Sequence, residues 1–140
     1  MLVGLVACIA CGGRGNLQSI QYVPQPDRIE RPQDALKALI LANTVQGCLT
    51  EPGYAQAMLI VRWVCTNAAG THVLRFDQIQ AIELLKSGEW YRVRVRHRAG
   101  VNDFEWDSKS LDDAQHIADA IAAIASHAPP PSPAATTTTI

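Results

Sequence analysis

Four arginines occupy every second position of one short stretch and form the strongest candidate binding surface. They are Arg92, Arg94, Arg96 and Arg98. A period of two over residues 90–98 predicts a β-strand that turns all four guanidinium groups to one face. Such a stripe of positive charge suits a partner of negative charge, either anionic lipid headgroups or an acidic protein.

A structural role for the same arginines competes with binding. The neighbouring predicted strands carry acidic side chains on the shared face, and opposite charges on facing strands stabilise a sheet by about 0.2–1 kcal/mol per pair. These acids are Glu83, Asp103, Glu105 and Asp107. They equal the arginines in number, so we expect cross-strand pairing to neutralise most of the stripe. A partner site would then remain toward Arg96 and Arg98.

The four histidines show no spacing that points to catalysis or metal binding. They are His72, His97, His116 and His127. His97 falls on the side of its predicted strand that faces the core, which favours a structural histidine. The sequence contains no phosphate-binding loop, nucleophile elbow or H-E-x-x-H motif. We therefore expect a protein that is not an enzyme and that uses no metal or cofactor.

Composition and charge are those of one ordinary globular domain. The 140 residues are 48% hydrophobic and 18% charged, with a formal net charge of −1. This length supports one sizeable core but not two. The net charge gives no global argument for binding nucleic acid or an acidic membrane. The composition thus disfavours nucleic acid as a partner, and any anion-binding site must be local.

The chain begins with an apolar run that is too short to span a membrane. Residues 1–8 are apolar, whereas a spanning helix needs roughly 20 such residues. Leu5, Val6, Ala7 and Cys8 resemble the lipobox of bacterial lipoproteins at all four positions, although no Lys or Arg precedes the run. The resemblance implies a signal segment over residues 1–11, a palmitate-bearing lipid at Cys8, and a membrane anchor in the cell envelope with the domain facing the periplasm.

The cysteines also allow other interpretations. Cys8 and Cys11 form a C-x-x-C pair, but a zinc site needs about four ligands and no second ligand pair follows in the sequence. Cys48 and Cys65 could form a disulfide if the domain is exported. In a cytosolic protein they would be small buried apolar residues. Spacing alone does not show whether their Cα atoms approach within about 7 Å.

Hydrophobic periodicity divides the rest of the chain into one α+β domain with loose ends. Polar residues and prolines predict a flexible linker over residues 12–31 and a disordered tail over residues 128–140. The domain between them covers residues 32–127. It begins with a short helix over residues 32–42, followed by a turn from Thr50 to Gly53. Strands are expected over residues 58–65, 71–76, 79–85, 90–98 and 102–107.

An amphipathic helix is expected to end the domain. Ser110 is in the N-cap position and Asp113 is where a capping-box acid belongs. Apolar residues then recur at spacings of three and four, which predicts one buried stripe. The opposite, solvent-facing side is expected to carry Asp112, Gln115, His116 and Asp119.

An antiparallel β-meander packed by an amphipathic C-terminal helix, with a short N-terminal helix before it, resembles the pleckstrin-homology-like fold. The likeness rests on residues 74–79, 91–95 and 104–106 and on the helix from Ser110. In that family a basic loop between the first strands binds phosphoinositides. The corresponding loop here, residues 67–70, carries no Lys or Arg, so the resemblance implies the fold and no phosphoinositide site.

Two functional hypotheses follow from these patterns. The first is a non-catalytic, lipid-anchored envelope protein with an interaction or structural domain. The second is a soluble cytosolic binding module that uses the basic strand face for a polyanion, whose binding would depend strongly on salt.

Overall fold

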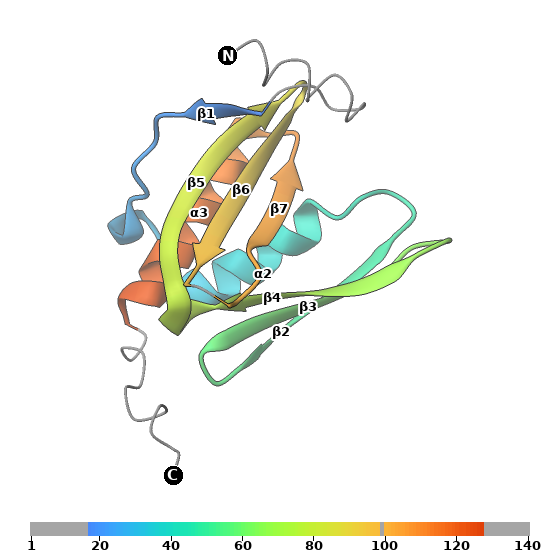
Figure 1. Ribbon diagram of the computed structural model, residues 1–140, viewed down its shortest axis with the longest axis horizontal. Helices are drawn as coiled ribbons and strands as arrows, with labels where there is room; N and C mark the ends of the chain where they lie inside the picture. The colour runs from blue at the N-terminus through green and yellow to red at the C-terminus, as the bar shows by residue number, and fades with distance from the viewer. Residues whose placement is uncertain (1–16, 99, 128–140) are drawn as a thin grey trace.

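Two antiparallel β-sheets meet at a corner, and two α-helices pack against them (Figure 1). The computed structural model describes residues 17–98 and 100–127. Within these residues one sheet has four strands in the order β1-β5-β6-β7, and the other has three in the order β2-β3-β4. We term the four-stranded sheet with its helices the body and the three-stranded sheet the arm. The expected α+β class, with antiparallel sheets, a C-terminal helix and a short helix on the N-terminal side, is confirmed.

The body is built on strands that pair in chain order. Strands β5 (Ile79–Ser87) and β6 (Trp90–His97) form a hairpin, and β7 (Phe104–Ser108) pairs with the other edge of β6. The β5–β6 turn needs a residue with positive φ, which Gly88 supplies at 63°. Alternation along β6 buries the valines between its arginines, so one face of the sheet is apolar and must be covered.

Helix α3 (Leu111–Ser126) covers that apolar face. The Ser110 hydroxyl accepts a hydrogen bond from the Asp113 backbone N–H at 3.1 Å, which is the predicted N-cap. The Asp113 carboxylate does not complete a capping box, because the Ser110 N–H donates to the Ser108 hydroxyl instead. The buried stripe of the helix includes Ala114, Ile117, Ala118, Ile121 and Ile124.

Helix α2 (Pro32–Ala42) links the body to the arm, because it packs against both α3 and β2. The arm consists of β2 (Leu49–Ala55), β3 (Met58–Val64) and β4 (Ala69–Arg75). Its end nearest the body belongs to the common core, while its other end projects away from the body in Figure 1. The core residues of α2 and the arm are Leu36, Ile40, Leu59, Val61 and Leu74.

Two sequence expectations about the strands are wrong. Strand β2 runs through the expected turn from Thr50 to Gly53. Pro52 is compatible with it because β2 is an edge strand, where a missing N–H is tolerated. The strands also do not form one continuous meander. A 3₁₀ turn, η2 (Phe76–Gln78), follows β4 and separates it from β5. At this turn, where Phe76 is buried, the chain changes direction and enters the second sheet.

Residues 17–31 are ordered on the body and do not match the flexible linker that their composition predicts. Strand β1 (Gln18–Ile20) pairs with β5, and the short 3₁₀ helix η1 (Pro26–Arg28) packs on α3. Prolines are well suited to this extended path along the surface, because it requires few backbone N–H donors. The segment therefore adds an edge strand to the sheet and a cover to one side of α3.

Asp119 of α3 holds this segment in place. Its Oδ1 accepts hydrogen bonds from the Tyr22 hydroxyl and the Gln25 backbone N–H, both at 2.7 Å. Arg28 lies 3.7 Å from Oδ2, at ion-pair distance. The expectation that Asp119 faces solvent is wrong: the carboxylate is fully buried because residues 22–28 cover it. We term these contacts the Asp119 clasp.

The described residues do not include either end of the chain. Cys8, Cys11 and the proline-rich tail fall in residues 1–16 and 128–140, so lipidation at Cys8 remains a prediction. Among the helices that the structure describes, none is long and apolar enough to cross a membrane.

Candidate binding cleft

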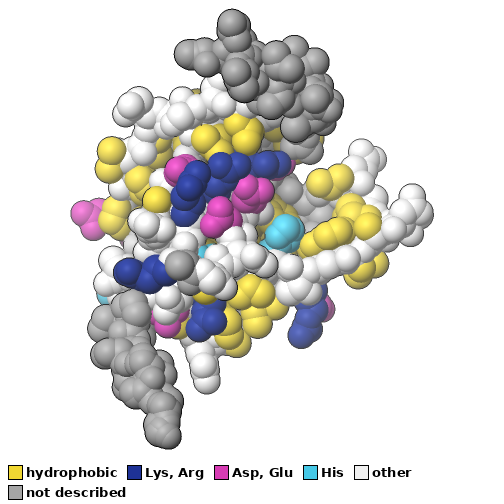
Figure 2. Space-filling model, in the orientation of Figure 1, with side chains coloured by type: hydrophobic (Ala, Val, Ile, Leu, Met, Phe, Trp, Pro, Cys, Tyr) yellow, Lys and Arg dark blue, Asp and Glu magenta, His cyan; other side chains and the backbone are white. Residues whose placement is uncertain are grey.

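The predicted arginine stripe lies on the face of the body sheet opposite α3, interleaved with acids (Figure 2). Arg92 and Arg94 face Asp107 and Glu105 across the β6–β7 pair, and Arg94 also faces Glu83 on β5. Together with Arg96 these side chains form what we term the charged ladder. Its members are three cations and three anions: Arg92, Arg94, Arg96, Glu83, Glu105 and Asp107.

Short ion pairs neutralise the charged ladder. Arg92 donates two hydrogen bonds to Asp107, from Nε at 2.8 Å and from Nη2 at 3.2 Å. Arg94 Nε donates to Glu105 at 2.7 Å, and Arg96 Nε donates to Glu83 at 3.2 Å. The hydrogen bond to Asp107 raises the pKa of Arg92, since it favours the charged guanidinium. The structural role that the sequence suggested for these arginines is thus present.

Arg98 and Asp103 stand apart from the charged ladder. Arg98 is exposed, and no acidic side chain in the described residues lies within ion-pair distance of it. Asp103, expected to pair with the stripe, accepts a hydrogen bond from the His97 backbone N–H at 3.4 Å instead. Of the four candidate arginines, only Arg98 therefore remains free to meet an anionic partner.

His97 has the structural role that its position predicts. Its side chain is 5% exposed. Nδ1 lies 2.6 Å from the Asn102 carbonyl oxygen, and Nε2 accepts a hydrogen bond from the Arg75 backbone N–H at 3.0 Å. A neutral ring with its proton on Nδ1 satisfies both contacts. His97 thereby ties the end of β4 to the β6–β7 connection, where the arm meets the body.

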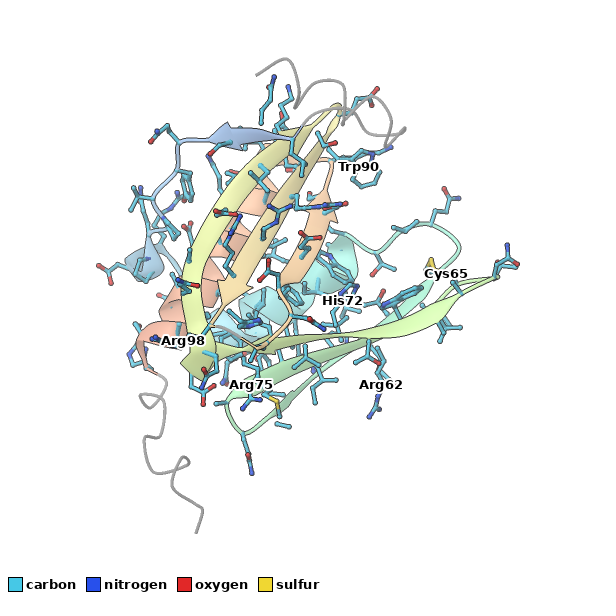
Figure 3. All side chains as sticks on the ribbon, in the orientation of Figure 1. Arg62, Cys65, His72, Arg75, Trp90 and Arg98 are labelled. Atoms are coloured by element: carbon cyan, nitrogen blue, oxygen red, sulfur yellow. A yellow bond between two sulfur atoms is a disulfide. The ribbon has the colours of Figure 1, made fainter. Side chains whose placement is uncertain are left out.

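A cleft of about 300 Å³ opens between the arm and the charged ladder. The inner face of the arm supplies one wall, with Trp63 and His72, and β7 supplies the other, with Trp106. Figure 3 shows His72 directed from β4 toward this side of the arm. The floor and rim also include Arg92 and Asp107, so the cleft combines aromatic walls with charged groups.

The aromatic walls pack around the His72 ring. Its centroid lies 6.2 Å from that of Trp63, 6.0 Å from Phe104 and 5.6 Å from Trp106, the latter two in edge-to-face geometry. Gly70 makes the position of Trp63 possible, because a Cβ at residue 70 would lie 2.7 Å from the indole ring. Any larger residue at 70 would displace this wall.

The cleft holds a hydrogen-bond donor without an acceptor. Trp106 Nε1 is buried and has no partner among the described residues. Burial lowers the pKa of His72, although Glu105 and Asp107 oppose the shift, so the ring lines the cleft as a neutral imidazole near pH 7. A buried indole N–H normally finds an acceptor, so the site is suited to a ligand that carries one.

A second, larger hollow of about 860 Å³ lies at the other end of the molecule. It lies between the start of α2, the β2–β3 turn and the end of α3. The Tyr54 hydroxyl donates to the Gln33 carbonyl at 2.7 Å, and burial raises the tyrosine pKa, so this polar group is already engaged. Asp77 also lines the hollow, and one of its carboxylate oxygens has no partner among the described residues. The rings of Tyr54 and Phe76 also line this hollow, and their centroids lie 6.3 Å apart.

A disulfide joins Cys48 and Cys65 at the rim of the cleft. Their Cα atoms lie 4.1 Å apart, which answers the question that spacing left open. The bond crosses from the residue before β2 to the residue after β3, at the projecting end of the arm. Within the described residues, no group of three or more His, Cys, Asp or Glu side chains could hold a metal ion.

Comparisons with known proteins do not assign the cleft. No family model matches the chain, and neither a curated protein nor a solved structure matches it at a significant level. The likeness to the pleckstrin-homology-like fold therefore rests on the sequence pattern alone.

Sequence reasoning singled out the arginines and missed the aromatic cluster. Trp63, His72 and Trp106 come from three different strands. Each was placed on a strand, but which faces of those strands would meet depends on the break at η2. Alternation in the sequence does indicate which face each tryptophan is on. Trp63 is in phase with the apolar residues Leu59 and Val61 of its strand, and Trp106 is in phase with Phe104.

Proposed function

We propose that this chain is an exported, lipid-anchored protein without catalytic activity, whose domain binds a ligand in the cleft between arm and body. The observation that carries the proposal is the Cys48–Cys65 disulfide. Disulfides persist in oxidising compartments and are rare in the cytosol. This favours the envelope hypothesis over the cytosolic one, and it agrees with the lipobox-like residues that end at Cys8.

The geometry supports binding in the cleft rather than along the arginine stripe. The charged ladder matches each of its three arginines with an acid, so it offers little net charge to a polyanion. The cleft instead offers three aromatic rings and an indole N–H that has no acceptor within residues 17–98 and 100–127. Concave sites with apolar walls and a few oriented polar groups are typical of ligand binding.

Fractionation of a bacterial host that expresses the full chain tests the anchor. We expect the wild-type chain in the membrane fraction and the Cys8→Ser variant in the soluble fraction, with Cys11→Ser as the matched control that stays membrane-bound. Cys48 and Cys65 should resist alkylation until a reductant is added. A soluble wild-type chain with two reactive thiols at these positions would contradict export and favour the cytosolic alternative.

A second experiment tests the cleft with defined probes. N-acetylglucosamine and indole-3-acetate both carry acceptors for Trp106 Nε1 and faces that pack on aromatic rings. We expect at least one to shift the Trp106 indole N–H resonance at millimolar concentration in the Cys8→Ser chain. The shift should disappear in His72→Ala, while Trp90 should not respond. No response of Trp106 to either probe would remove the cleft as the site for these two ligand classes.

A further inference from the structure

The arm has a second face that no other part of the described structure covers. Alternation along its strands sends Leu59, Val61 and Leu74 into the core and sends their neighbours outward. Figure 3 shows Arg62 on the side of the arm opposite His72 and the cleft. We term this surface the outer face. Several of its apolar side chains are strongly exposed: Leu49 at 78%, Val64 at 54% and Val73 at 37%.

The outward residues of β2 and β3 pair in a regular way. In the register of the hairpin, Glu51 lies opposite Arg62, which places an acid beside a base. The other three outward pairs join an apolar residue to an apolar one, or a small residue to a large one. They are Leu49 with Val64, Gly53 with Ile60, and Ala55 with Met58.

Glu51 and Arg62 of the same copy do not form an ion pair with each other. Both side chains are exposed, and neither forms an ion pair with any of the described residues, although their Cα atoms are partners in the sheet. This contrasts with the charged ladder, where every facing acid and arginine is in contact. The charges of the outer face therefore remain available to a partner.

A two-fold axis makes this pattern complementary to itself. If the axis runs parallel to the strands and between β2 and β3, the β2 strand of one copy lies over the β3 strand of the other. Glu51 then meets Arg62 of the second copy, and the reverse contact forms at the same time. Ile60 and Met58 meet the gaps above Gly53 and Ala55, and Leu49 meets Val64. Such an isologous contact is the commonest arrangement of homodimers.

We propose that the outer face of the β2–β3 hairpin binds a second copy of this chain. The contact is small, because only β2 and β3 overlap: a strand of seven residues is roughly 23 Å long and two strands are roughly 10 Å across. It would thus bury on the order of 200 Å² of sheet per copy, which is compatible only with a weak, reversible interface. We expect self-association in the micromolar range or weaker. The inference is independent of what binds in the cleft.

Charge reversal tests the proposal in a way that a general loss of folding cannot imitate. The experiment uses the full chain with Cys8→Ser and Cys11→Ser, and measures self-association by sedimentation across a concentration series. Arg62→Glu places two acids on the face, and Glu51→Arg places two bases on it. We expect each variant alone to self-associate at least about tenfold more weakly, because like charges would meet across the axis.

An equimolar mixture of the two variants tests whether Glu51 and Arg62 pair across the two copies. In the mixed pair every acid again meets a base, so the mixture should associate at least as tightly as the wild-type chain. Lys37→Glu, an exposed charge reversal on α2, should leave association unchanged. A monomeric wild-type chain at all concentrations, or a mixture no tighter than its components, would overturn the proposal. Outer-face resonances that respond only to phospholipid vesicles would assign the face to a lipid surface instead.

Discussion

The body and the arm are stabilised by different means. In the body, a sheet and two helices enclose residues such as Phe104, Ile117 and Ile121, all fully buried. The arm buries only its near end, while its far end exposes Leu49 and Val64 and is closed by a disulfide. Burial fixes the body, whereas a covalent bond fixes the part of the arm that burial does not reach. The far end of the arm stays exposed, and it forms part of both the cleft and the outer face.

The two regions also use their outward charges differently. On the body, Arg92 and Arg94 lie against acids on the adjacent strand. On the arm, Glu51 and Arg62 are opposite each other in register but unpaired among the described residues. The three paired arginines of the charged ladder therefore leave less charge for a partner than Glu51 and Arg62, which are not in contact with each other. The number of charges on a strand is therefore a weaker indicator of a binding surface than whether residues on the neighbouring strand form ion pairs with them.

The largest expected effect is a loss of core packing where the two regions meet. Phe104→Ala removes a fully buried ring that contacts the His72 side chain, and such truncations cost about 3–5 kcal/mol. Urea unfolding should show this decrease in the free energy of unfolding. Val73→Ala on the outer face is the control and should cost less than about 1 kcal/mol. Equal losses would mean that the arm is as tightly packed as the body.

Removing the disulfide should weaken the arm more than the body. The bond closes a sequence separation of 17 residues, and loop-closure entropy for such a loop is about 3 kcal/mol. In a Cys48→Ala/Cys65→Ala variant we expect faster hydrogen exchange in β2 and β3 and little change in α3. Uniformly faster exchange across both regions would show that they unfold as one unit and would weaken the distinction drawn above.

Loss of the Asp119 clasp should affect the body alone. Asp119→Ala leaves the Tyr22 hydroxyl and the Gln25 N–H without their acceptor, at a cost of about 1–3 kcal/mol. Limited proteolysis should then cut within residues 21–28 of the variant before it cuts the arm. Asp112→Ala, on the exposed side of the same helix, should be nearly neutral. Similar proteolysis of both variants would argue against the clasp.

A smaller effect is expected from acidification at the junction. Burial lowers the pKa of His72 below 6.5, so folding favours the neutral ring. That contribution is present above the unfolded pKa and is lost as the pH falls through the lower folded pKa. Wild-type protein should therefore lose more stability between pH 7 and pH 5 than His72→Phe does. An NMR titration of the His72 ring with a pKa above 6.5 would contradict this expectation.

Local pattern predicted most elements of the fold. Alternation gave β3 to β7 within a few residues, and the capping residue Ser110 marked the start of α3 correctly. The cross-strand pairing of the arginines also followed from alternation. These features depend on neighbours in sequence or in adjacent strands, which a periodic pattern encodes directly.

Features that depend on distant contacts could not be predicted in this way. The order of residues 17–31 depends on the pairing of β1 with β5 and on hydrogen bonds to Asp119, which lies about 95 positions further along the chain. This segment has no hydrophobic periodicity, so its sequence predicts no helix or strand. It is nevertheless ordered, because the folded body provides hydrogen-bond partners for it. The aromatic cleft likewise exists only because η2 turns one sheet against the other. The Cys48–Cys65 bond depends on the register of β2 and β3, which spacing does not reveal.

The pairing of β1 with β5 has a consequence for the distance between the domain and a membrane. The chain is fixed to the body from Gln18 onward, which is ten positions after the proposed lipid site at Cys8. A fully extended chain gains about 3.3–3.6 Å per residue, which sets a reach of roughly 35 Å. Strand β1 would thus keep the domain within about one domain diameter of the bilayer. The Asp119 clasp holds the residues that follow β1, so both the β1–β5 pairing and the clasp would have to open to release residues 18–28 and about double that reach.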